Sequence, residues 1–346
     1  MERAFFVGKM LGGKKNIVYI FPFIIQNETK KAGNFMKNIC LKAETVGVSK
    51  LKSGSMAKRK FHILTDSGSD LPQEYFAEHG VECVKLGFIM DGVEYLGENG
   101  QEIDLQAFYG RLRAGAKPTT YQITPEVAQA RMRRVLEKGL DILVIAFSSG
   151  LSGTADSFFV AQKALSKEYP ERKIFVVDSL CASLGQGLLV NYVVEKADEG
   201  ATIEETYEYA ENLKLSINHQ FTVNDLFHLK RGGRVSSATA IVGTMLNVKP
   251  MLHVSDEGKL TTTGKVMGRQ KSLRKLVQNM QESADLGESD PIYISHADCI
   301  EDARFVQGLV QKSYPQNPIF ISYIGPVIGS HAGSGTVALF FKSRKR

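Results

Sequence analysis

From Phe61 onward the chain alternates short apolar runs with amphipathic segments of helix length. Apolar runs at residues 61–67, 141–149 and 173–179 each end in polar residues. The run at 141–149 is almost entirely apolar, which is typical of a strand that is buried on both faces. Alternation of this kind indicates a parallel sheet covered by helices, and it predicts an α/β fold for the first part of the body.

The helix-length segments carry boundary signals of their own. Residues 125–139 begin with Pro125, which suits a first helical turn, and end at Gly139. Other expected helices cover residues 153–170, 184–200 and 202–217, and extended segments cover residues 81–90 and 92–96. Because parallel sheets bind ligands at the carboxyl ends of their strands, the polar residues after each strand are candidates for a site.

The pattern changes near Asn218, where strands joined by tight turns replace the regular alternation. Residues 256–258 (Asp-Glu-Gly) indicate a hairpin turn. Expected strands cover residues 220–226, 249–255, 259–266, 290–298 and 318–325, and expected helices cover 236–247 and 267–285. This part is interpreted as a smaller, antiparallel α+β domain. The expected division is an extension over 1–57, an α/β domain over 58–217 and the α+β domain over 218–346.

The formal net charge of +6 is concentrated in the first 57 residues. These residues hold 10 Lys/Arg against 3 Asp/Glu, whereas the rest of the chain holds 33 against 34. A domain that binds a polyanion normally carries the basic excess on its own folded surface. Nucleic-acid binding by the body is therefore not expected.

The first 57 residues contain one apolar stretch, residues 16–25, which Pro22 interrupts. Polar residues follow it, where a secretory signal would place small residues and a cleavage site. Met56 stands directly before a basic segment and the first expected strand. We therefore expect residues 1–57 to be a poorly ordered extension that contributes little to the fold.

The four cysteines are far apart and show no spacing of a zinc site or a redox pair; they are Cys40, Cys83, Cys181 and Cys299. Free thiols in a reducing cytoplasm are the simplest interpretation, so a cytoplasmic location is expected. No apolar run reaches the roughly 18 residues of a membrane-spanning helix. We expect no metal site and no stable membrane insertion, and at most a transient contact with a membrane.

Polar residues gather in three clusters at expected strand ends or glycine-rich turns. The clusters are residues 65–69, residues 148–154 and residues 325–336. Hydroxyl groups and free backbone N–H groups at a helix start can bind an anion. A simpler alternative is that Ser152 or Thr154 only caps a helix. Likewise, His331 lies among four glycines, which suggests close approach to a ligand, but a lone histidine is more often structural.

Basic residues form two further groups. Lys230, Arg231 and Arg234 surround two glycines in the segment 229–236, and a second group lies near the start of the helix expected at 267–285. Such groups either bind a partner or remain as solvated surface, and the residues alone leave both readings open.

No catalytic set emerges from the sequence. There is no HExxH, GxSxG or Walker A spacing. Asp66 and Asp178 at strand ends could ligate magnesium in principle, but they lack the neighbouring carboxylates of such a site. They are interpreted as turn-forming residues.

The polar clusters resemble the sequence pattern of the DegV family, whose members include the fatty-acid-binding subunits of bacterial fatty acid kinase. The resemblance covers residues 60–343 and rests on five landmarks in the same order. They are TDSGSDLP at 65–72, PTTYQITPE at 118–126, SSGLSGT at 148–154, LKRGGRVS at 229–236 and GPVIGSHAGSG at 325–335. Five landmarks in this order, with an α/β part followed by an antiparallel part, indicate the family more strongly than any single one.

The resemblance implies a Rossmann-like N-terminal domain, a smaller α+β C-terminal domain and an acyl chain in an apolar tunnel between them. The ligand would be one long-chain fatty acid, such as palmitate, stearate or oleate, and no other cofactor is expected. By position, the carboxylate would be bound by Thr120, Ser149 and His331. Supporting pocket loops would be formed by Thr65, Asp66, Ser67, Ser148, Ser152, Gly153 and Gly333. Docking on an ATP-dependent kinase subunit would involve Arg234 and Arg269.

The chemistry of these residues suits a carrier that presents a carboxylate and has no catalytic centre of its own. Hydroxyl and imidazole groups can bind the acid without a full counter-charge, so a grip by neutral donors is expected. Tyr121 stands where the family often has Ser, which bears on the shape of the loop and on chain preference. Two alternatives stay open: an acyl hydrolase or transferase that uses Ser149 and His331, and a lipid-sensing regulatory protein.

Overall fold

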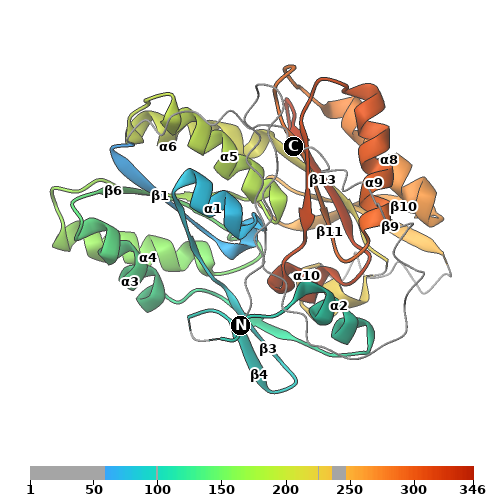
Figure 1. Cartoon of the computed structure of the whole chain (residues 1–346), viewed down its shortest axis with the longest axis horizontal. Coiled ribbons are helices and arrows are strands. Elements are labelled where there is room, and N and C mark those ends of the chain that lie inside the picture. The colour runs from blue at the N-terminus through green and yellow to red at the C-terminus, as the bar shows by residue number, and fades with distance from the viewer. Residues whose placement is uncertain (1–58, 99, 225, 236–246) are drawn as a thin grey trace, which may run out of the picture. The chain divides into compact units, whose positions relative to one another are not determined.

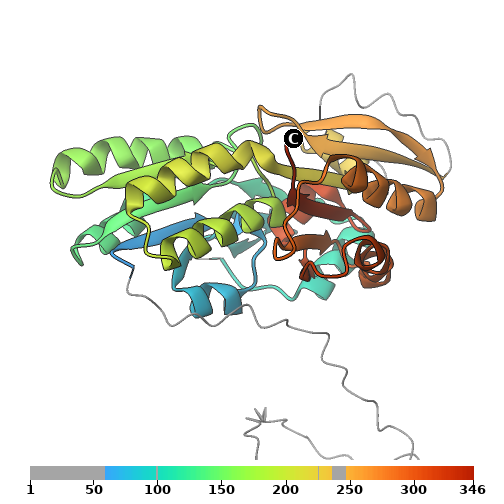
Figure 2. The same ribbon diagram turned by 90° about the horizontal axis from the view of Figure 1, so that it is seen from above.

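The computed structural model describes residues 59–98, 100–224, 226–235 and 247–346. The proposed extension at 1–57, with Cys40, lies outside these residues, and so does nearly all of the helix expected at 236–247. The described residues form three sheets and their helices. Figures 1 and 2 show two of them side by side, the 4-stranded parallel sheet and the larger 6-stranded sheet.

The first sheet, sheet A, is fully parallel, as the sequence predicts. Its strands stand in the order β2-β1-β6-β7. They are β1 (Phe61–Asp66), β2 (Val81–Val84), β6 (Asp141–Ala146) and β7 (Ile174–Asp178). The expected apolar runs at 61–67, 141–149 and 173–179 are confirmed as strands of this sheet.

Helices cover both faces of sheet A, because successive side chains of each strand point to opposite faces. Ile63 and Leu143 pack in one core with α1 (Gln73–His79), α5 (Leu184–Asp198) and α6 (Ile203–Leu213). Leu64 and Val144 pack in a second core with α3 (Pro125–Leu136) and α4 (Thr154–Glu168). All four strand residues are completely buried, which explains the near-continuous apolar runs. Sheet A and these helices are called the first lobe below.

The helix ends follow the signals in the sequence. The Thr124 side chain accepts a hydrogen bond from the Val127 N–H, and Pro125 occupies the first turn of α3. Gly139, two residues after the cap of that helix, has φ of 75°, which glycine adopts at little cost. Thr202 and Glu205 form a reciprocal capping box at the start of α6.

The largest sheet, sheet C, has the order β10-β9-β8-β13-β11-β12. Its strands are β8 (Ile217–Thr222), β9 (Val248–Val254), β10 (Leu260–Met267), β11 (Ile292–His296), β12 (Ile319–Tyr323) and β13 (Val337–Lys342). Four of its pairs are antiparallel, as expected, but β11 and β12 are parallel. The reason is the connection, because α9 (Ile300–Ser313) crosses between them and a helical crossover returns the chain in the same direction.

One face of sheet C packs against α8 (Arg269–Ser283) and α9, with Ile294 and Leu339 in their common core. The other face turns toward the first lobe, where Tyr293 and Phe340 share a core with α5. Sheet C with α8 and α9 is called the second lobe. The chain enters it at Ile217, close to the expected boundary at 217/218, and that domain boundary stays a prediction.

A small third sheet, sheet B, was not foreseen as a separate unit. It has the antiparallel order β4-β3-β5, with β3 (Gly87–Met90), β4 (Val93–Leu96) and β5 (Thr119–Tyr121). Shorter helical elements complete the fold: α2 (Leu105–Arg113), α7 (Phe227–Arg231), α10 (Pro326–Ala332), η1 (Ser67–Ser69) and η2 (Lys214–Ser216).

Helix α10 corrects the sequence interpretation of residues 325–336 as a glycine-rich turn. Pro326 occupies the first helical turn, and Gly329 is needed for packing rather than for a turn. A Cβ atom at Gly329 would lie 2.4 Å from the Tyr109 hydroxyl oxygen. The helix therefore begins where the glycines suggested irregular backbone.

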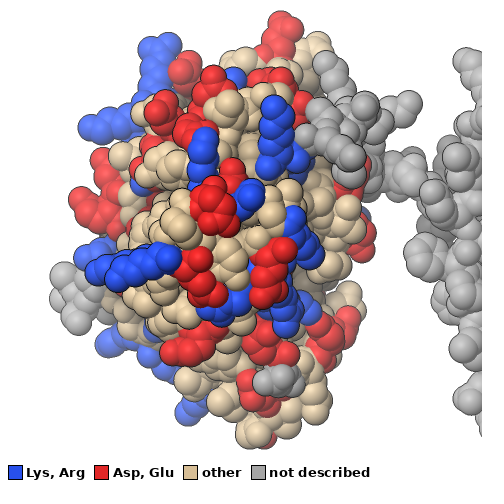
Figure 3. Space-filling view, turned by 90° about the vertical axis from the view of Figure 1, so that its left-hand side faces the viewer, with Lys and Arg blue, Asp and Glu red and all other residues tan. Residues whose placement is uncertain are grey.

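The surface of the body mixes both signs of charge, and Figure 3 shows Lys and Arg interspersed with Asp and Glu on one face. This mixture agrees with the nearly equal counts of the two kinds of residue after position 57. Within the described ranges, no helix has the length and apolar character needed to cross a membrane.

Candidate functional site

A cavity of about 330 Å³ lies where the two lobes and sheet B meet. This volume falls near the lower end of the roughly 300 to 1,000 Å³ of typical ligand sites. Apolar side chains form most of its wall, including Phe147, Leu151, Phe221, Leu229, Val254, Val327, Ile328 and Phe340. Polar side chains enter the wall at Thr120, Tyr121, Gln122, Ser152, Ser183, His219, Arg234, His331 and Thr336.

The topology of sheet A explains the position of this cavity. Strands β1 and β6 are neighbours, but the chain leaves β1 toward β2 at one edge of the sheet and leaves β6 toward β7 at the other edge. The loops after β1 and β6 therefore diverge and leave a crevice at the carboxyl ends of the strands. Phe147, Leu151 and Ser152 of the loop after β6 line the cavity at this place.

Thr120 and His331 form the central polar contact of the cavity wall. Thr120 lies in β5 and His331 in the last turn of α10, and the two residues are 211 positions apart in the sequence. The Thr120 Oγ1 atom is 2.8 Å from His331 Nε2. Two of the three residues expected to bind a carboxylate are therefore brought together.

The His331 imidazole is held in its neutral form. Burial lowers its pKa from 6.5 to about 4, and the nearby positive charges of Arg234 and Arg231 act in the same direction. Its other ring nitrogen, Nδ1, is buried and has no hydrogen-bond partner among the described residues. A buried polar atom of this kind is costly unless it is satisfied. A Cβ at Gly232 would lie 2.1 Å from it, so Nδ1 faces the backbone of the segment 229–235.

Arg234 lines the cavity, which differs from the expected grip by neutral donors alone. Its Nε donates to the Leu151 carbonyl at 3.1 Å, and its Nη1 donates to the Gly232 carbonyl at 2.6 Å. These bonds turn the guanidinium toward the loop after β6. The sequence signal was its position after two glycines, but spacing alone could not show which way the side chain turns.

Ser149 and Ser152 lie in the same loop but face different surroundings. Ser149 is exposed and is not among the residues that line the cavity, and its backbone N–H donates to Asp178 Oδ1 at 3.1 Å. Ser152 lines the cavity, and its hydroxyl is 2.9 Å from that of Thr154. The carboxylate role of Ser149 stays a prediction, while Ser152 is the serine of this loop that reaches the cavity.

The polar groups of the first cluster, residues 65–69, mostly form hydrogen bonds within the protein. Thr65 is buried and donates from Oγ1 to the Ile145 carbonyl at 2.8 Å. Asp66 accepts from the backbone N–H groups of Gly68 and Phe147 at 2.9 and 2.7 Å. Burial still raises the pKa of Asp66 from 3.8 to about 6. These residues join the loops after β1 and β6 and stand behind the cavity wall.

The remaining supporting residues also serve the loops. Ser67 Oγ accepts from the Leu86 N–H at 2.9 Å, and Ser148 Oγ donates to the Gly258 carbonyl at 2.8 Å. Gly153 allows close packing, because a Cβ there would lie 2.3 Å from Gln122 Oε1. Gly333 has φ of 80°, and a Cβ there would lie 2.5 Å from the His228 ring.

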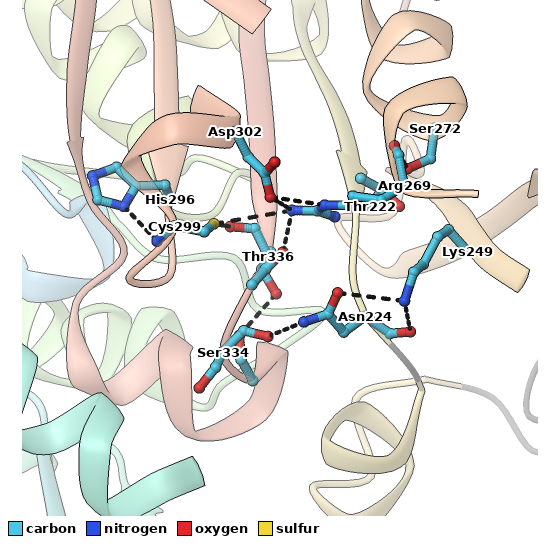
Figure 4. A network of polar contacts seen from close by, with 12 residues as sticks. Thr222, Asn224, Lys249, Arg269, Ser272, His296, Cys299, Asp302, Ser334 and Thr336 are labelled. Carbon is cyan, nitrogen blue, oxygen red and sulfur yellow. Dashed lines mark hydrogen bonds and ion pairs between the residues drawn. The ribbon is translucent and has the colours of Figure 1, made fainter. Parts of the chain in front are cut away.

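Arg269, expected at a docking face, is committed to contacts within the second lobe (Figure 4). Its Nε donates to Asp302 Oδ2 at 2.9 Å, and its Nη2 donates to the Gly335 carbonyl at 2.5 Å. Asn224 holds the same loop by donating to the Ser334 carbonyl at 3.0 Å (Figure 4). These contacts fix the segment that follows α10 and so support the position of His331.

Sequence reasoning missed several wall residues, among them Gln122, Ser183 and His219. His219 is fully buried, and its Nε2 accepts from the Ala182 N–H at 3.2 Å while Nδ1 faces the Ile217 carbonyl at 3.0 Å. Gln122 lies inside the landmark at 118–126 but was not singled out, and no short motif surrounds Ser183 or His219. Among the described residues, no group of three His, Cys, Asp or Glu side chains could hold a metal ion.

Comparison with known proteins gives consistent results. A family model described as "Uncharacterised protein, DegV family" matches residues 60–344. A DegV domain-containing protein of Clostridium perfringens is 41% identical over 283 residues, which cover 82% of this chain and 97% of that protein. A second DegV domain-containing protein, from Lactococcus lactis, is 33% identical over 285 residues and covers 82% of this chain and 98% of its own.

Solved structures agree. A DegV family protein from Thermus thermophilus, described for its fatty acid binding, has a TM-score of 0.72 at 32% identity over 82% of this chain and 99% of that one. A fatty acid binding DegV from Bacillus subtilis has a TM-score of 0.72 at 28% identity over 83% of this chain and 100% of its own. The sequence match over nearly the whole body and the shared fold show that the chain belongs to the DegV family.

Proposed function

We propose that this chain binds one long-chain fatty acid in the cavity between its lobes, with the carboxylate at the Thr120 and His331 end. The observation that carries this proposal is the Thr120–His331 pair, set in a largely apolar cavity with a buried His331 Nδ1 that has no partner among the described residues. The fatty acids bound by the Thermus thermophilus and Bacillus subtilis proteins support the same class of ligand.

The two parts of such a ligand would be held by different forces. Burial at about 0.8 kcal/mol per CH₂ gives on the order of 11 kcal/mol for a sixteen-carbon chain, before the costs of ordering. A good charge-assisted hydrogen bond to the carboxylate adds roughly 1.5 to 3 kcal/mol. Chain burial therefore sets the affinity, and the polar groups fix the orientation.

Arg234 changes the electrostatics expected of the carboxylate site. Its positive charge lowers the pKa of His331 in the ligand-free protein, so the two side chains interact electrostatically. A bound carboxylate would stabilise the positive charge of Arg234 and the protonated form of His331, because an anion stabilises neighbouring positive charge. Ser152 of the loop after β6 can supply a further hydroxyl, since it lines the same cavity.

We further propose that the chain presents this carboxylate to an ATP-dependent kinase subunit, which would form the acyl phosphate. The sequence has no Walker A spacing to cradle a nucleotide, so the phosphoryl donor would be bound by the partner. The segment 229–235 carries Lys230, Arg231 and Arg234, and it lies next to the cavity through Leu229 and Arg234. This arrangement supports docking of an anionic surface beside the bound acid.

Nothing in the geometry favours the alternative of a hydrolase that uses Ser149 and His331. Ser149 is exposed and outside the cavity wall, and His331 Nε2 faces Thr120 instead. A catalytic histidine is normally oriented by a carboxylate on its other nitrogen, and His331 Nδ1 has no such partner within the described ranges. A lipid sensor would share the cavity and differ only in its partner.

The first test is native mass spectrometry of the full chain purified from bacterial cells, followed by extraction and identification of lipids. A co-purifying free fatty acid is expected, and turnover of an acyl ester by an empty protein would contradict the proposal. Addition of a candidate kinase subunit and ATP then separates a carrier from a sensor, with acyl phosphate as the readout.

Arg234→Ala and Arg269→Ala form a matched pair for the docking proposal. Arg234→Ala should weaken both lipid retention and phosphorylation, because Arg234 lines the cavity. Arg269→Ala should act mainly through the loop at Gly335, which its guanidinium holds. Normal phosphorylation in both variants would remove these arginines from the docking face.

A further inference from the structure

Asp70 joins four segments at the boundary between the lobes. Its Oδ1 accepts from the Gly325 N–H at 2.9 Å, and its Oδ2 accepts from the Ser183 hydroxyl at 2.5 Å. The Ser183 hydroxyl is also 3.1 Å from that of Ser295 in β11. We call these four residues, Asp70, Ser183, Ser295 and Gly325, the seam.

The seam fixes the start of the helix that builds the site. Gly325 directly precedes α10, whose residues Val327, Ile328 and His331 line the cavity. The fit is close, because a Cβ at Gly325 would lie 2.6 Å from Asp70 Oδ1. A second bond holds the same turn, since the Tyr109 hydroxyl donates to the Ile324 carbonyl at 2.7 Å.

The carboxyl of Asp70 is buried without a cation. It is 8% exposed, and no Lys or Arg of the described residues forms an ion pair with it. Burial raises its pKa from 3.8 to about 7, and the hydrogen bonds from Ser183 and Gly325 offset this only in part. When the carboxyl is protonated, Oδ1 still accepts from Gly325, while the Oδ2–H donates to Ser183 and the Ser183 hydroxyl donates to Ser295.

The other titratable groups around Asp70 come from every neighbouring element. Asp66, the last residue of β1, raises the pKa of Asp70, and the charge of Asp70 raises the pKa of Cys83 in β2 and of Tyr109 in α2. His296 follows Ser295 in β11, and its own pKa is lowered by burial. His331 stands at the far end of α10, and the first charged residue of α5 is Glu195, beyond the middle of that helix.

We propose that Asp70 is a proton-linked positioning residue, whose carboxyl holds the start of α10 when protonated and favours release of that turn, and of the bound fatty acid, when ionised. This inference rests on the proposed function for its ligand. The sign follows from linkage. In the closed state the seam holds the start of α10, and the pKa of Asp70 is raised. Protonation of Asp70 therefore stabilises this state fully below the ordinary carboxyl pKa of 3.8, and the stabilisation is lost as the pH rises through about 7.

His331 acts in the opposite direction and must be separated from Asp70. Its pKa is lowered to about 4, so acid favours states in which its ring reaches water. The pH profile of the wild-type protein therefore contains both contributions. Comparison with Asp70→Asn isolates the Asp70 part, because the variant keeps His331 and meets the same ligand. Asparagine also keeps the size of the side chain and can donate to Ser183.

The experiment measures release of a fluorescent long-chain fatty acid from the full chain into an excess of phosphatidylcholine vesicles, from about pH 5 to about pH 8. The ratio of the wild-type rate to the Asp70→Asn rate should rise about fivefold or more over this range. Tyr109→Phe is the matched control, because it loses a bond to the same turn without losing a titrating group. Its rate should change by a similar factor at every pH.

A constant wild-type to Asp70→Asn ratio would overturn the proposal, and so would a ratio in Tyr109→Phe that follows pH equally strongly. If Asp70→Asn does not fold, Ser183→Ala supplies the test, since loss of its hydroxyl should move the midpoint of the profile to higher pH; an unmoved midpoint contradicts the proposal.

Hydrogen exchange of the amides of α10 in lipid-free protein gives a readout that needs no ligand. Protection of these amides in the wild type, relative to Asp70→Asn, should fall as the pH rises. If the chain binds no fatty acid but this change is seen, the proposed function fails and the linkage of Asp70 to α10 stands. If the chain binds a fatty acid but protection shows no such difference, the proposed function stands and the linkage of Asp70 to α10 fails.

Discussion

Polar side chains gather in two regions, one behind the cavity wall and one in it, and the regions differ in how those side chains are satisfied. At the end of β1 and in the loop after β6, Thr65, Asp66 and Ser148 bond to backbone groups of the protein itself. In the wall formed by β5 and α10, Thr120 and His331 bond to each other and leave His331 Nδ1 without a partner among the described residues.

The difference separates polar residues that build the site from those that face its ligand. A buried group whose bonds are all made within the chain has little to offer a ligand, whereas an incomplete one gains by binding. Composition alone cannot make this distinction, because both regions are rich in hydroxyl groups and glycine. The loops after β1 and β6 hold the shape of the crevice, and the β5 and α10 wall supplies the chemistry.

Asp66→Asn tests the first region and should have the largest effect. The pKa of Asp66 is raised to about 6, so its contribution to stability is present below about pH 4 and is lost as the pH rises through 6. Two pKa units correspond to about 3 kcal/mol, and the variant should lack this part of the pH dependence. Urea unfolding across this pH range measures it. If the unfolding free energy of both proteins depends on pH in the same way, the Asp66 carboxyl is solvated and the loops around it admit water.

His331→Ala tests the second region. Loss of the imidazole should weaken retention of a fatty acid about 10- to 100-fold, the equivalent of roughly 1.5 to 3 kcal/mol for one charge-assisted hydrogen bond. His331→Gln is the control, because its amide can still donate to a carboxylate and should recover part of the loss. Dissociation rates of a fluorescent fatty acid measure both. Unchanged retention in His331→Ala would place the carboxylate elsewhere.

Ser152→Ala and Ser149→Ala sharpen the comparison within one loop. The first removes a hydroxyl from the cavity wall and should weaken binding by about 1 kcal/mol, or roughly fivefold. The second changes an exposed residue and should leave affinity nearly the same. Isothermal titration with one fatty acid compares the two variants directly. The reverse order of effects would support the original assignment of Ser149 as a carboxylate ligand.

Tyr121→Phe should have the smallest effect. The Tyr121 hydroxyl donates to Glu94 in β4, and its ring packs on Gly87 and Gly97, where added Cβ atoms would lie 2.1 and 2.4 Å from the hydroxyl oxygen. Loss of one exposed hydrogen bond should cost about 0.5 kcal/mol of stability. Thermal unfolding checks this, and chain-length preference should stay as in the wild type. A changed preference would show that the hydroxyl, and not only the ring, shapes the cavity.

The sequence predicted the parallel sheet well, because strands buried on both faces must be apolar throughout. It also placed α3 through Pro125, which is a local signal, and it placed α6 within the helix expected at 202–217. It failed at α10, where glycines that allow close packing look like turn residues, and at the parallel pair of β11 and β12, whose direction depends on a connection rather than on composition.

The candidate site was predicted only in part. Thr120 and His331 were named through family resemblance, and the structure brings them together. A sequence pattern does not contain side-chain direction. It therefore could not show that Arg234 points into the cavity, or that Ser152 and not Ser149 lines it. Ser183 and Asp70 were missed as a pair because 113 positions separate them.

The distance in sequence between Thr120 and His331 has a consequence for how the protein is made. A growing chain acquires the threonine 211 positions before the histidine that completes the pair. Before then, sheet C also lacks β13, the strand that links β8 to β11. A chain that has not yet been extended past His331 thus lacks one half of the pair.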